Sequence, residues 1–274
     1  VNKEILKKAN ELELIGCARG GPVNINVEAA TKEGIPVVNA PGRNKDAVAE
    51  FAIGLILSET RSISESHASM IHNKEWRGDL YSFDKAGKEL ENSLLGVVGF
   101  GHIGKKFSEL FQAFGGNVVV YDPYVEEQKV QETGVEYTST LGDLLQSADI
   151  VSLHARHSQE THNMFGESEF SAMKQTAYFI NTARGGLVDH GSLLDALREK
   201  EIEGAALDTY YEEPLPKSDD LFDFDNVTLT SHIGGASKQT AIRSAQLIAQ
   251  DVDNFLSGDQ LNNCLNPEVV SQEV

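Results

Sequence analysis

Two patterns of hydrophobic and polar residues alternate along the middle of the chain. Short runs that are apolar throughout are typical of parallel strands covered on both faces, and the segments between them repeat apolar residues at helical spacing. This alternation predicts a parallel sheet flanked by helices. The predicted strands are 95–100, 117–121, 149–154, 177–182, 205–208 and 227–230. The predicted helices are 103–114, 141–148 (opened by a capping box at Thr140) and 192–200.

The two ends of the chain carry smaller pieces of the same kind. The runs 12–17 and 35–39 predict strands, and 46–73 has apolar residues at helical spacing, which predicts one long helical segment. Residues 239–256 predict an amphipathic helix. The fold class predicted is therefore α/β, with a Rossmann-type, doubly wound sheet of six or seven strands in the middle.

The sequence GFGHIG at 99–104 lies between a predicted strand and a predicted helix. Three glycines at this spacing permit a tight turn, a close approach of a pyrophosphate to the backbone, and close packing of the helix on the strand. The helix N-terminus would offer unpaired N–H groups to the phosphates. Asp122, 23 residues after Gly99, would accept hydrogen bonds from the adenosine ribose and repel a 2′-phosphate, which favours NAD over NADP.

The motif alone is weak evidence, because glycine is common; the strand, the helix and the spaced acid give it weight. The predicted cofactor-binding residues here are Gly99, Gly101, His102, Ile103, Gly104 and Asp122. A glycine-rich turn without a ligand is the alternative. For the acid, the alternative is a turn or capping residue before Pro123.

Composition narrows the class of protein. The chain has 274 residues, 40% of them hydrophobic, and a net charge of −19. Such acidity argues against a nucleic-acid partner, although a cleft can still attract a small anionic substrate. The two cysteines, Cys17 and Cys264, belong to no metal-binding motif, and no metal site is expected. No apolar run suits a membrane span or a secretory signal, so we expect a cytoplasmic protein without a membrane partner.

Three polar residues follow the carboxyl ends of predicted strands, where ligands bind in such sheets. Arg184 has the planar donors that suit a carboxylate and a carbonyl, and His232 can exchange a proton near neutral pH. Glu213 could orient that histidine. Together they would suit hydride transfer to a 2-oxo acid. Each also has a simpler reading as an ordinary surface residue.

Five stretches carry a resemblance to a known family: NAPGRNKDAVAE (39–50), GFGHIG, NTARGGLVD (181–189), GAALDTYYEEPLP (204–216) and SHIGGAS (231–237). Together they resemble the D-isomer-specific 2-hydroxyacid dehydrogenases, which include phosphoglycerate, hydroxypyruvate and glyoxylate-reducing enzymes. The resemblance implies that Arg184 binds substrate, that His232 is the acid/base and that Glu213 is its partner. It implies cofactor contacts at Thr182, Ala183, Asp208 and Gly234, and substrate contacts at Gly20, Gly21, Arg184 and His232.

The resemblance also implies an organisation. The substrate domain, flavodoxin-like and smaller, would be 1–45 plus 239–274, and the NAD-binding domain 46–238. The family has a further βαβα stretch before the strand at 12–17, so this substrate domain is expected to be incomplete at its N-terminus. The segment 46–73 would contribute to a homodimer interface or, alternatively, cover the sheet of its own subunit.

Some residues depart from the family pattern. Arg156 stands near a usual proline and Val23 replaces a common aspartate. Arg19, Arg43 and Arg156 could attract an anionic substrate tail or be solvated surface residues. The leading prediction is an NAD-dependent oxidoreductase acting on a small D-2-hydroxy acid. An NAD-sensing regulator or corepressor on the same fold, and a formate- or phosphite-type dehydrogenase, stay as alternatives.

Overall fold

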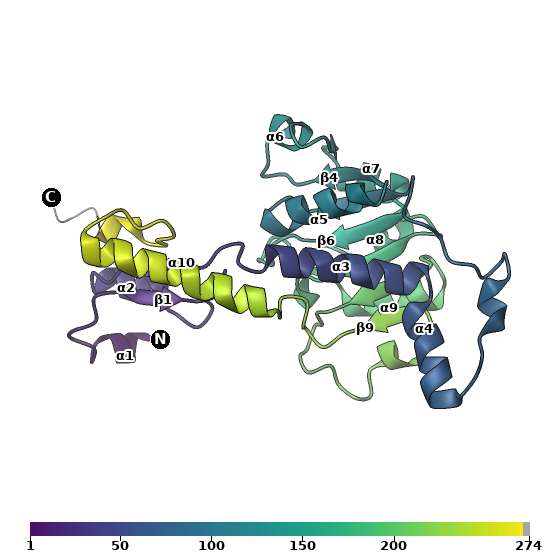
Figure 1. Ribbon diagram of the computed structural model, residues 1–274, viewed down its shortest axis with the longest axis horizontal. Coiled ribbons are helices and arrows are strands. Elements are labelled where there is room, and N and C mark those ends of the chain that lie inside the picture. Colours follow the sequence, from purple (N-terminus) through teal and green to yellow (C-terminus); the bar gives the residue numbers. More distant parts are fainter. Residues whose placement is uncertain (271–274) are drawn as a thin grey trace. The chain divides into compact units, whose positions relative to one another are not determined.

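The structure, a computed structural model, describes residues 1–270 (Figure 1). The chain separates into two units, one comprising residues 1–44 with 236–274 and the other residues 45–235. Each unit has its own parallel sheet. We describe the larger unit first, because it holds the glycine motif and the three candidate catalytic residues.

Seven parallel strands form the sheet of the larger unit, in the order β5-β4-β3-β6-β7-β8-β9. The order reverses between β3 and β6, where the connections leave in opposite directions, as in dinucleotide-binding sheets. Val98 at the end of β3 pairs with Tyr121 of β4 and Leu153 of β6, so these three strands end together. The strands are β3 (Leu94–Val98), β4 (Asn117–Tyr121), β5 (Glu136–Tyr137), β6 (Ile150–Leu153), β7 (Tyr178–Asn181), β8 (Gly204–Leu207) and β9 (Val227–Leu229).

Helices cover both faces of this sheet (Figure 1). Alternate residues of each strand point to opposite faces, and in β4 Val119 packs with one core while Val118 and Val120 pack with the other. One core contains α3 (Lys45–Thr60) and α5 (His102–Ala113). The other contains α7 (Leu141–Ser147), α8 (Glu167–Ala172) and α9 (His190–Arg198). A short helix, α6 (Glu127–Gln131), lies between β4 and β5. Burial on both faces explains why most residues of these strands are apolar.

The segment 46–73 is not one helix, which corrects the sequence prediction. Helix α3 ends at Thr60, α4 (Ile63–Ala68) follows, and a π-helical turn η1 (Ser69–Asn73) continues it. The break falls at Ser62, whose φ of 49° lies in the left-handed region that no helix interior uses. A 3₁₀ turn, η2 (Gly78–Tyr81), follows before the chain returns to the sheet.

The smaller unit pairs two parallel strands, β1 (Ile15–Cys17) and β2 (Val37–Asn39). Asn26 caps α2 (Val27–Lys32), which connects them. Helix α10 (Lys238–Ser257) packs on both strands, and a Cβ on Gly16 would lie 2.7 Å from the Ile248 side chain. The remaining elements here are α1 (Lys3–Leu6) and the 3₁₀ turn η5 (Pro267–Val269).

Within residues 1–270, none of the helices has both the length and the apolar character that crossing a membrane would require. Helix α10, with 20 residues, is the longest of them. Its mixture of charged and apolar residues instead suits packing on one face. The cytoplasmic location stays a prediction.

Candidate active site

The glycine motif forms a tight connection from β3 to α5. Gly99 has φ +98°, and a Cβ there would lie 2.6 Å from the backbone nitrogen of Ala155. A Cβ on Gly104 would lie 2.2 Å from the carbonyl oxygen of Gly99. Gly101 differs, since it is the N-cap of α5 and a Cβ there meets no atom within 4 Å. Two glycines therefore serve close packing, and the third leaves open space at a helix N-terminus, where anions bind.

Asp122 holds this connection in place from the end of β4. Its Oδ2 accepts a hydrogen bond from the backbone N–H of Phe100 at 2.7 Å, and its Oδ1 accepts one from Tyr124 at 2.9 Å. Asp122 therefore acts as a turn residue, which is the alternative role that the sequence left open for it. Each carboxylate oxygen has two lone pairs, so these bonds leave acceptor capacity for a ribose hydroxyl. His102 and Ile103 are the first two residues of α5.

Arg184 follows β7 in a turn that Asn181 organises. The buried Asn181 side chain donates to the carbonyl of Arg184 at 3.0 Å and accepts from the N–H of Ala183 at 3.0 Å. These two bonds bend the chain sharply after the strand. The Arg184 guanidinium is exposed, and its Nη1 donates to the Ala183 carbonyl at 2.6 Å. Its other donors have no hydrogen-bond partner in the described part of the chain, so they can contact a carboxylate.

His232 and Glu213 form the central pair of the site. His232 Nδ1 lies 2.6 Å from Glu213 Oε2, and the side chains are 43% and 37% exposed. Glu213 Oε1 also accepts from the N–H of Tyr210 at 3.1 Å. With Nδ1 directed at a carboxylate, the ring presents Nε2 as the nitrogen able to exchange a proton with a ligand. His154 cannot do so in the same way, because burial lowers its pKa to about 3.

Asp208, at the end of β8, fixes the backbone around His232. Its carboxylate, 1% exposed, accepts from the N–H groups of Ile233 at 2.9 Å and Gly234 at 2.8 Å, and from Thr230 Oγ1 at 2.7 Å. His232 has φ +56°, a strained value for a residue with a side chain. Three hydrogen bonds to one carboxylate compensate for that strain. The cofactor contact that the resemblance implies for Asp208 stays a prediction.

Thr182 and Ala183 lie in the same turn as Arg184. Thr182 is 7% exposed, and its hydroxyl is buried without a hydrogen-bond partner among the described residues. Buried polar groups are normally paired. The hydroxyl therefore suits a ligand at the carboxyl end of β7. Gly234 packs against Asp208 and Phe51, with no room for a Cβ.

The two predicted substrate glycines belong to the smaller unit. Gly20 and Gly21 follow β1 in an exposed bend, and the buried Asn39 side chain donates to the Gly20 carbonyl at 2.7 Å. A second bond, from Ala40 N–H to the Arg19 carbonyl at 3.0 Å, ties the same bend to the end of β2. A Cβ on Gly21 would meet nothing within 4 Å. This bend is thus firmly held and open to solvent.

The three arginines outside the family pattern differ in their surroundings. Arg19 and Arg156 are exposed. Arg43 is half-buried, with Nη1 3.3 Å from Ser244 Oγ of α10 and its Nε buried without a partner among residues 1–270. Attraction of an anionic tail stays a prediction for all three.

Sequence reasoning missed the residues whose side chains hold the candidate loops in place by hydrogen bonds to their backbone. Asn181, Asn39 and Tyr210 bond to the backbone of the loops that carry the candidates. Tyr210 Oη has one proton, which it directs at the carbonyl oxygens of Thr230 at 2.7 Å and Leu207 at 3.1 Å. Burial raises the pKa of Tyr210 to about 12, which keeps this proton on the oxygen. An asparagine stands at the end of the predicted strand 35–39 and one residue before the end of the predicted strand 177–182, and this was the available signal.

Comparison with known proteins decides the family. Residues 53–234 match the family described as D-isomer specific 2-hydroxyacid dehydrogenase, NAD binding domain. This chain belongs to that family. The resemblance seen in the sequence is confirmed, and so are the Rossmann-type fold class and the expectation of an NAD-dependent oxidoreductase family.

The relatives of this chain include a phosphoglycerate dehydrogenase and a glyoxylate reductase. D-3-phosphoglycerate dehydrogenase of Methanocaldococcus jannaschii is 37% identical over 273 residues, covering 100% of this chain and 51% of that protein. Glyoxylate reductase of Aeropyrum pernix is 38% identical over 272 residues, covering 98% and 81%. The chain therefore spans about half the length of the first relative and about four fifths of the second.

Solved structures agree with these sequence relatives. The NAD-complexed D-isomer specific 2-hydroxyacid dehydrogenase of Lactobacillus delbrueckii ssp. bulgaricus has a TM-score of 0.85 and 30% identity, covering 97% of this chain and 83% of that one. The cofactor prediction, NAD, is confirmed by the family's NAD-binding domain. The residues present fit it, since Gly101 is open at a helix N-terminus and the Thr182 hydroxyl has no hydrogen-bond partner within residues 1–270.

Proposed function

We propose that this protein interconverts a small D-2-hydroxy acid and the corresponding 2-oxo acid, with NAD as the cofactor. The observation that carries the proposal is the 2.6 Å contact between His232 and Glu213 in a family member whose exposed Arg184 also follows the end of a strand. These are the acid/base and the carboxylate-binding groups that such a reaction requires.

His232 handles the proton. In the reductive direction its Nε2 donates a proton to the carbonyl oxygen of the substrate, and in the oxidative direction it removes the hydroxyl proton. Glu213 accepts from Nδ1 and stabilises the charged ring while Nε2 is protonated. Asp208 holds the backbone that aims the ring.

Arg184 binds the carboxylate and stabilises negative charge as it develops on the carbonyl oxygen. Its guanidinium is exposed to solvent and can contact a substrate, because Asn181 holds the bend of the chain at Arg184. The backbone N–H groups at Gly20 and Gly21 are proposed as further carboxylate donors, on a bend that Asn39 holds rigid. A bound NADH supplies the hydride that reduces the carbonyl carbon.

The relatives suggest which acids to test. Their names include glyoxylate reductase and D-3-phosphoglycerate dehydrogenase. We therefore propose glyoxylate, hydroxypyruvate and 3-phosphohydroxypyruvate as the substrate candidates. The decisive test follows NADH oxidation at 340 nm with each acid and the full-length protein. Turnover with at least one of them is expected, and none across a broad panel of 2-oxo acids would reject the function.

We also propose a homodimer built on residues 61–87. This excursion leaves the end of α3 after Thr60 and returns beside the same residue, since Lys88 N–H bonds to the Thr60 carbonyl and a Cβ on Gly87 would lie 2.1 Å from that oxygen. Arg77 braces it through Glu65 and Asp79. Its most exposed large side chains are Trp76 at 82%, Tyr81 at 94% and Phe83 at 97%.

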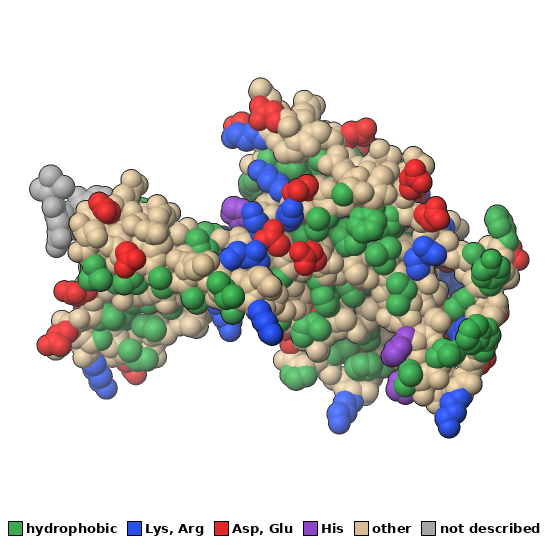
Figure 2. All heavy atoms as spheres, viewed as in Figure 1, with side chains coloured by type: hydrophobic (Ala, Val, Ile, Leu, Met, Phe, Trp, Pro, Cys, Tyr) green, Lys and Arg blue, Asp and Glu red, His purple; other side chains and the backbone are tan. Residues whose placement is uncertain are grey.

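Hydrophobic side chains gather on this excursion at the right of Figure 2. Apolar surface of this kind, rimmed by charged residues, is typical of interaction sites. The excursion is braced by its own ion pairs, so it presents a preformed surface. A second copy of the chain, which brings an identical surface, is the partner that we propose.

A further inference from the structure

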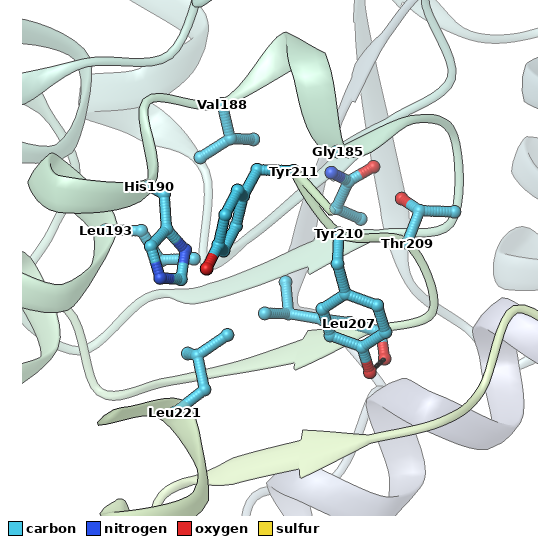
Figure 3. Close-up of a pocket in the computed structure, with 10 residues that line it drawn as sticks. Gly185, Val188, His190, Leu193, Leu207, Thr209, Tyr210, Tyr211 and Leu221 are labelled. Carbon is cyan, nitrogen blue, oxygen red and sulfur yellow. Dashed lines mark hydrogen bonds between the residues drawn. The ribbon is translucent and has the colours of Figure 1, made fainter. Parts of the chain in front are cut away.

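A buried carboxylate outside the reacting groups binds two other side chains. Asp219 has a side chain only 3% exposed. Its Oδ2 lies 3.0 Å from His190 Nε2 and accepts from Tyr211 Oη at 3.1 Å. Its Oδ1 accepts from the N–H of Leu221 at 3.0 Å. The His190 and Tyr211 rings also face each other, with centroids 4.3 Å apart (Figure 3). Every oxygen of this carboxylate therefore has a partner.

This cluster closes the loop that carries Glu213. The hydrogen bond between Tyr211 and Asp219 joins two residues eight positions apart, and Glu213 lies within the segment that they close. At the start of the loop, the Tyr210 N–H fixes one oxygen of Glu213. Burial and the bond to Asp219 raise the pKa of Tyr211, which keeps its proton on the oxygen that donates.

The same cluster connects the loop to the turn that carries Arg184. After Arg184 the chain forms a 3₁₀ turn, η3 (Gly185–Leu187), and then enters α9 at His190. A Cβ on Gly185 would lie 1.9 Å from the Tyr210 carbonyl group, so the two segments are in direct backbone contact. The bond from His190 to Asp219 thus locks together the segments that bear Arg184 and Glu213.

The cavity beside the cluster is too small for a substrate. It measures about 20 Å³ and is lined by His190, Tyr211 and Thr209, among others (Figure 3). That volume holds about one water molecule. The cavity is therefore too small to bind a second ligand. The contacts of Asp219, His190 and Tyr211 instead hold the loop.

We propose that Asp219, together with His190 and Tyr211, is a positioning residue: it fixes Glu213 against His232 and thereby acts on proton transfer without touching the substrate. The inference rests on the proposed function for its effect on turnover. Its structural part, the effect on the contact between Glu213 and His232, does not depend on which acid the enzyme reduces.

A double-mutant cycle on the full-length protein tests the proposal. Asp219→Asn alone is expected to lower kcat about tenfold, since small displacements of a catalytic group cost one to two orders of magnitude. It should leave the KM for NADH unchanged. In a Glu213→Gln background the same change should lower kcat less than about twofold, because residues that act through one another are not additive.

The matched control is Asp220→Asn. Asp220 is the next residue, and it pairs with Arg198 at the surface, with a half-exposed side chain. This variant should keep the wild-type kcat. A loss at Asp219 that persists undiminished in the Glu213→Gln background, or an equal loss at Asp220, would overturn the proposal.

Two additions keep the test decisive. If Asp219→Asn fails to fold, Tyr211→Phe enters the same cycle, because it removes one hydroxyl and keeps the ring contact with His190.

The NMR signal of the His232 Nδ1 proton, assigned by its loss in His232→Gln, is measured in every variant. We expect it in wild type and Asp220→Asn and expect it broadened or lost in Asp219→Asn. If wild type reduces no 2-oxo acid, the function fails and this signal still decides the positioning role; an unchanged signal in Asp219→Asn rejects it.

Discussion

His232 Nδ1 lies 2.6 Å from Glu213 Oε2, and the backbone at His232 is held in a left-handed conformation by Asp208. A strained residue whose backbone is held by a buried carboxylate and whose side chain pairs with another acid is typical of a functional site. The arrangement leaves Nε2 for proton exchange. The two acids have different roles: Asp208 holds the backbone next to His232, and Glu213 orients the His232 ring.

Replacement of His232 by Gln removes the proton donor and keeps a side chain of similar reach. We expect kcat to fall about 10²–10⁴-fold, the usual contribution of a positioned acid/base. The Kd for NADH, measured by fluorescence titration, should change little, since His232 is assigned to the substrate. A variant that keeps wild-type turnover would remove His232 from the mechanism.

Gly99 and Gly101 should respond differently to the same added methyl group. Gly99→Ala places a Cβ 2.6 Å from the Ala155 backbone at φ +98°, so we expect the free energy of unfolding to fall by about 2–4 kcal/mol. Gly101→Ala meets open space and should cost less than about 1 kcal/mol. Its Kd for NADH should rise at least about tenfold, or 1.4 kcal/mol.

Denaturant unfolding and NADH titration measure the two effects separately. The pair serves as its own control, because both changes add one methyl group to the same turn. Tight NADH binding by a folded Gly101→Ala variant would show that the pyrophosphate does not approach this glycine.

Asp122→Asn tests the choice of cofactor. The amide oxygen of Asn can still accept from the Phe100 N–H, although the bond from the Tyr124 N–H is lost, so the turn should persist with a lower stability. Loss of the charge removes repulsion of a 2′-phosphate, and we expect the ratio of kcat/KM for NADPH to that for NADH to rise about tenfold, which corresponds to 1.4 kcal/mol. Glu126→Gln, an exposed acid nearby, is the control and should leave the ratio unchanged. A wild-type enzyme that prefers NADPH would contradict the role of Asp122.

The sequence predicted the sheet well where the chain itself marks the ends of strands. Strand β4 matches at both ends, because Gly115 and Gly116 precede it and Asp122 and Pro123 follow it. Strand β5 was missed since it has only two residues, one of them charged. The break at Ser62 was missed as well, because apolar spacing continues across it and nothing local marks a left-handed residue there.

The candidate catalytic residues could also be proposed from the sequence, but part of what holds them could not. Arg184, Glu213 and His232 could be proposed because each follows a recognisable strand. Asp219 and His190 could not, since neither is in a recognisable motif and their contact depends on how α9 packs beside the loop after β8. Burial of an acid is a tertiary property, and one sequence contains no direct record of it.

Glu59 makes stability depend on pH. Burial raises its pKa to about 7, and Thr228 Oγ1 donates to it. Below its ordinary pKa of 4.5, Glu59 is neutral in both the folded and the unfolded protein, so its burial does not lower the free energy of unfolding. Above about pH 7 it is charged in both states, and burial of the charge lowers the free energy of unfolding by the full amount. Glu59→Gln should therefore match wild type near pH 4.5. At pH 8 it should be more stable by about 3 kcal/mol, from 1.36 kcal/mol per unit of pKa.

Urea unfolding at several pH values measures this difference. Glu50→Gln changes an exposed carboxyl on the same helix and is expected to follow the wild-type curve. A constant difference between Glu59→Gln and wild type from pH 4.5 to 8 would show that Glu59 does not titrate in this range.

Trp76 and Phe83 test the dimer. Both side chains lie on the excursion 61–87 and are more than four fifths exposed in a single chain. Changing both to Ser removes apolar area from the proposed interface, at about 25 cal/mol per Å² of buried surface, and should leave the fold of each chain intact. We expect wild type to sediment as a dimer and the double variant as a monomer in analytical ultracentrifugation. Phe222→Ser, 55% exposed and outside the excursion, is the matched control and should stay dimeric. A wild-type monomer at micromolar concentration would reject a second copy as the partner of this surface.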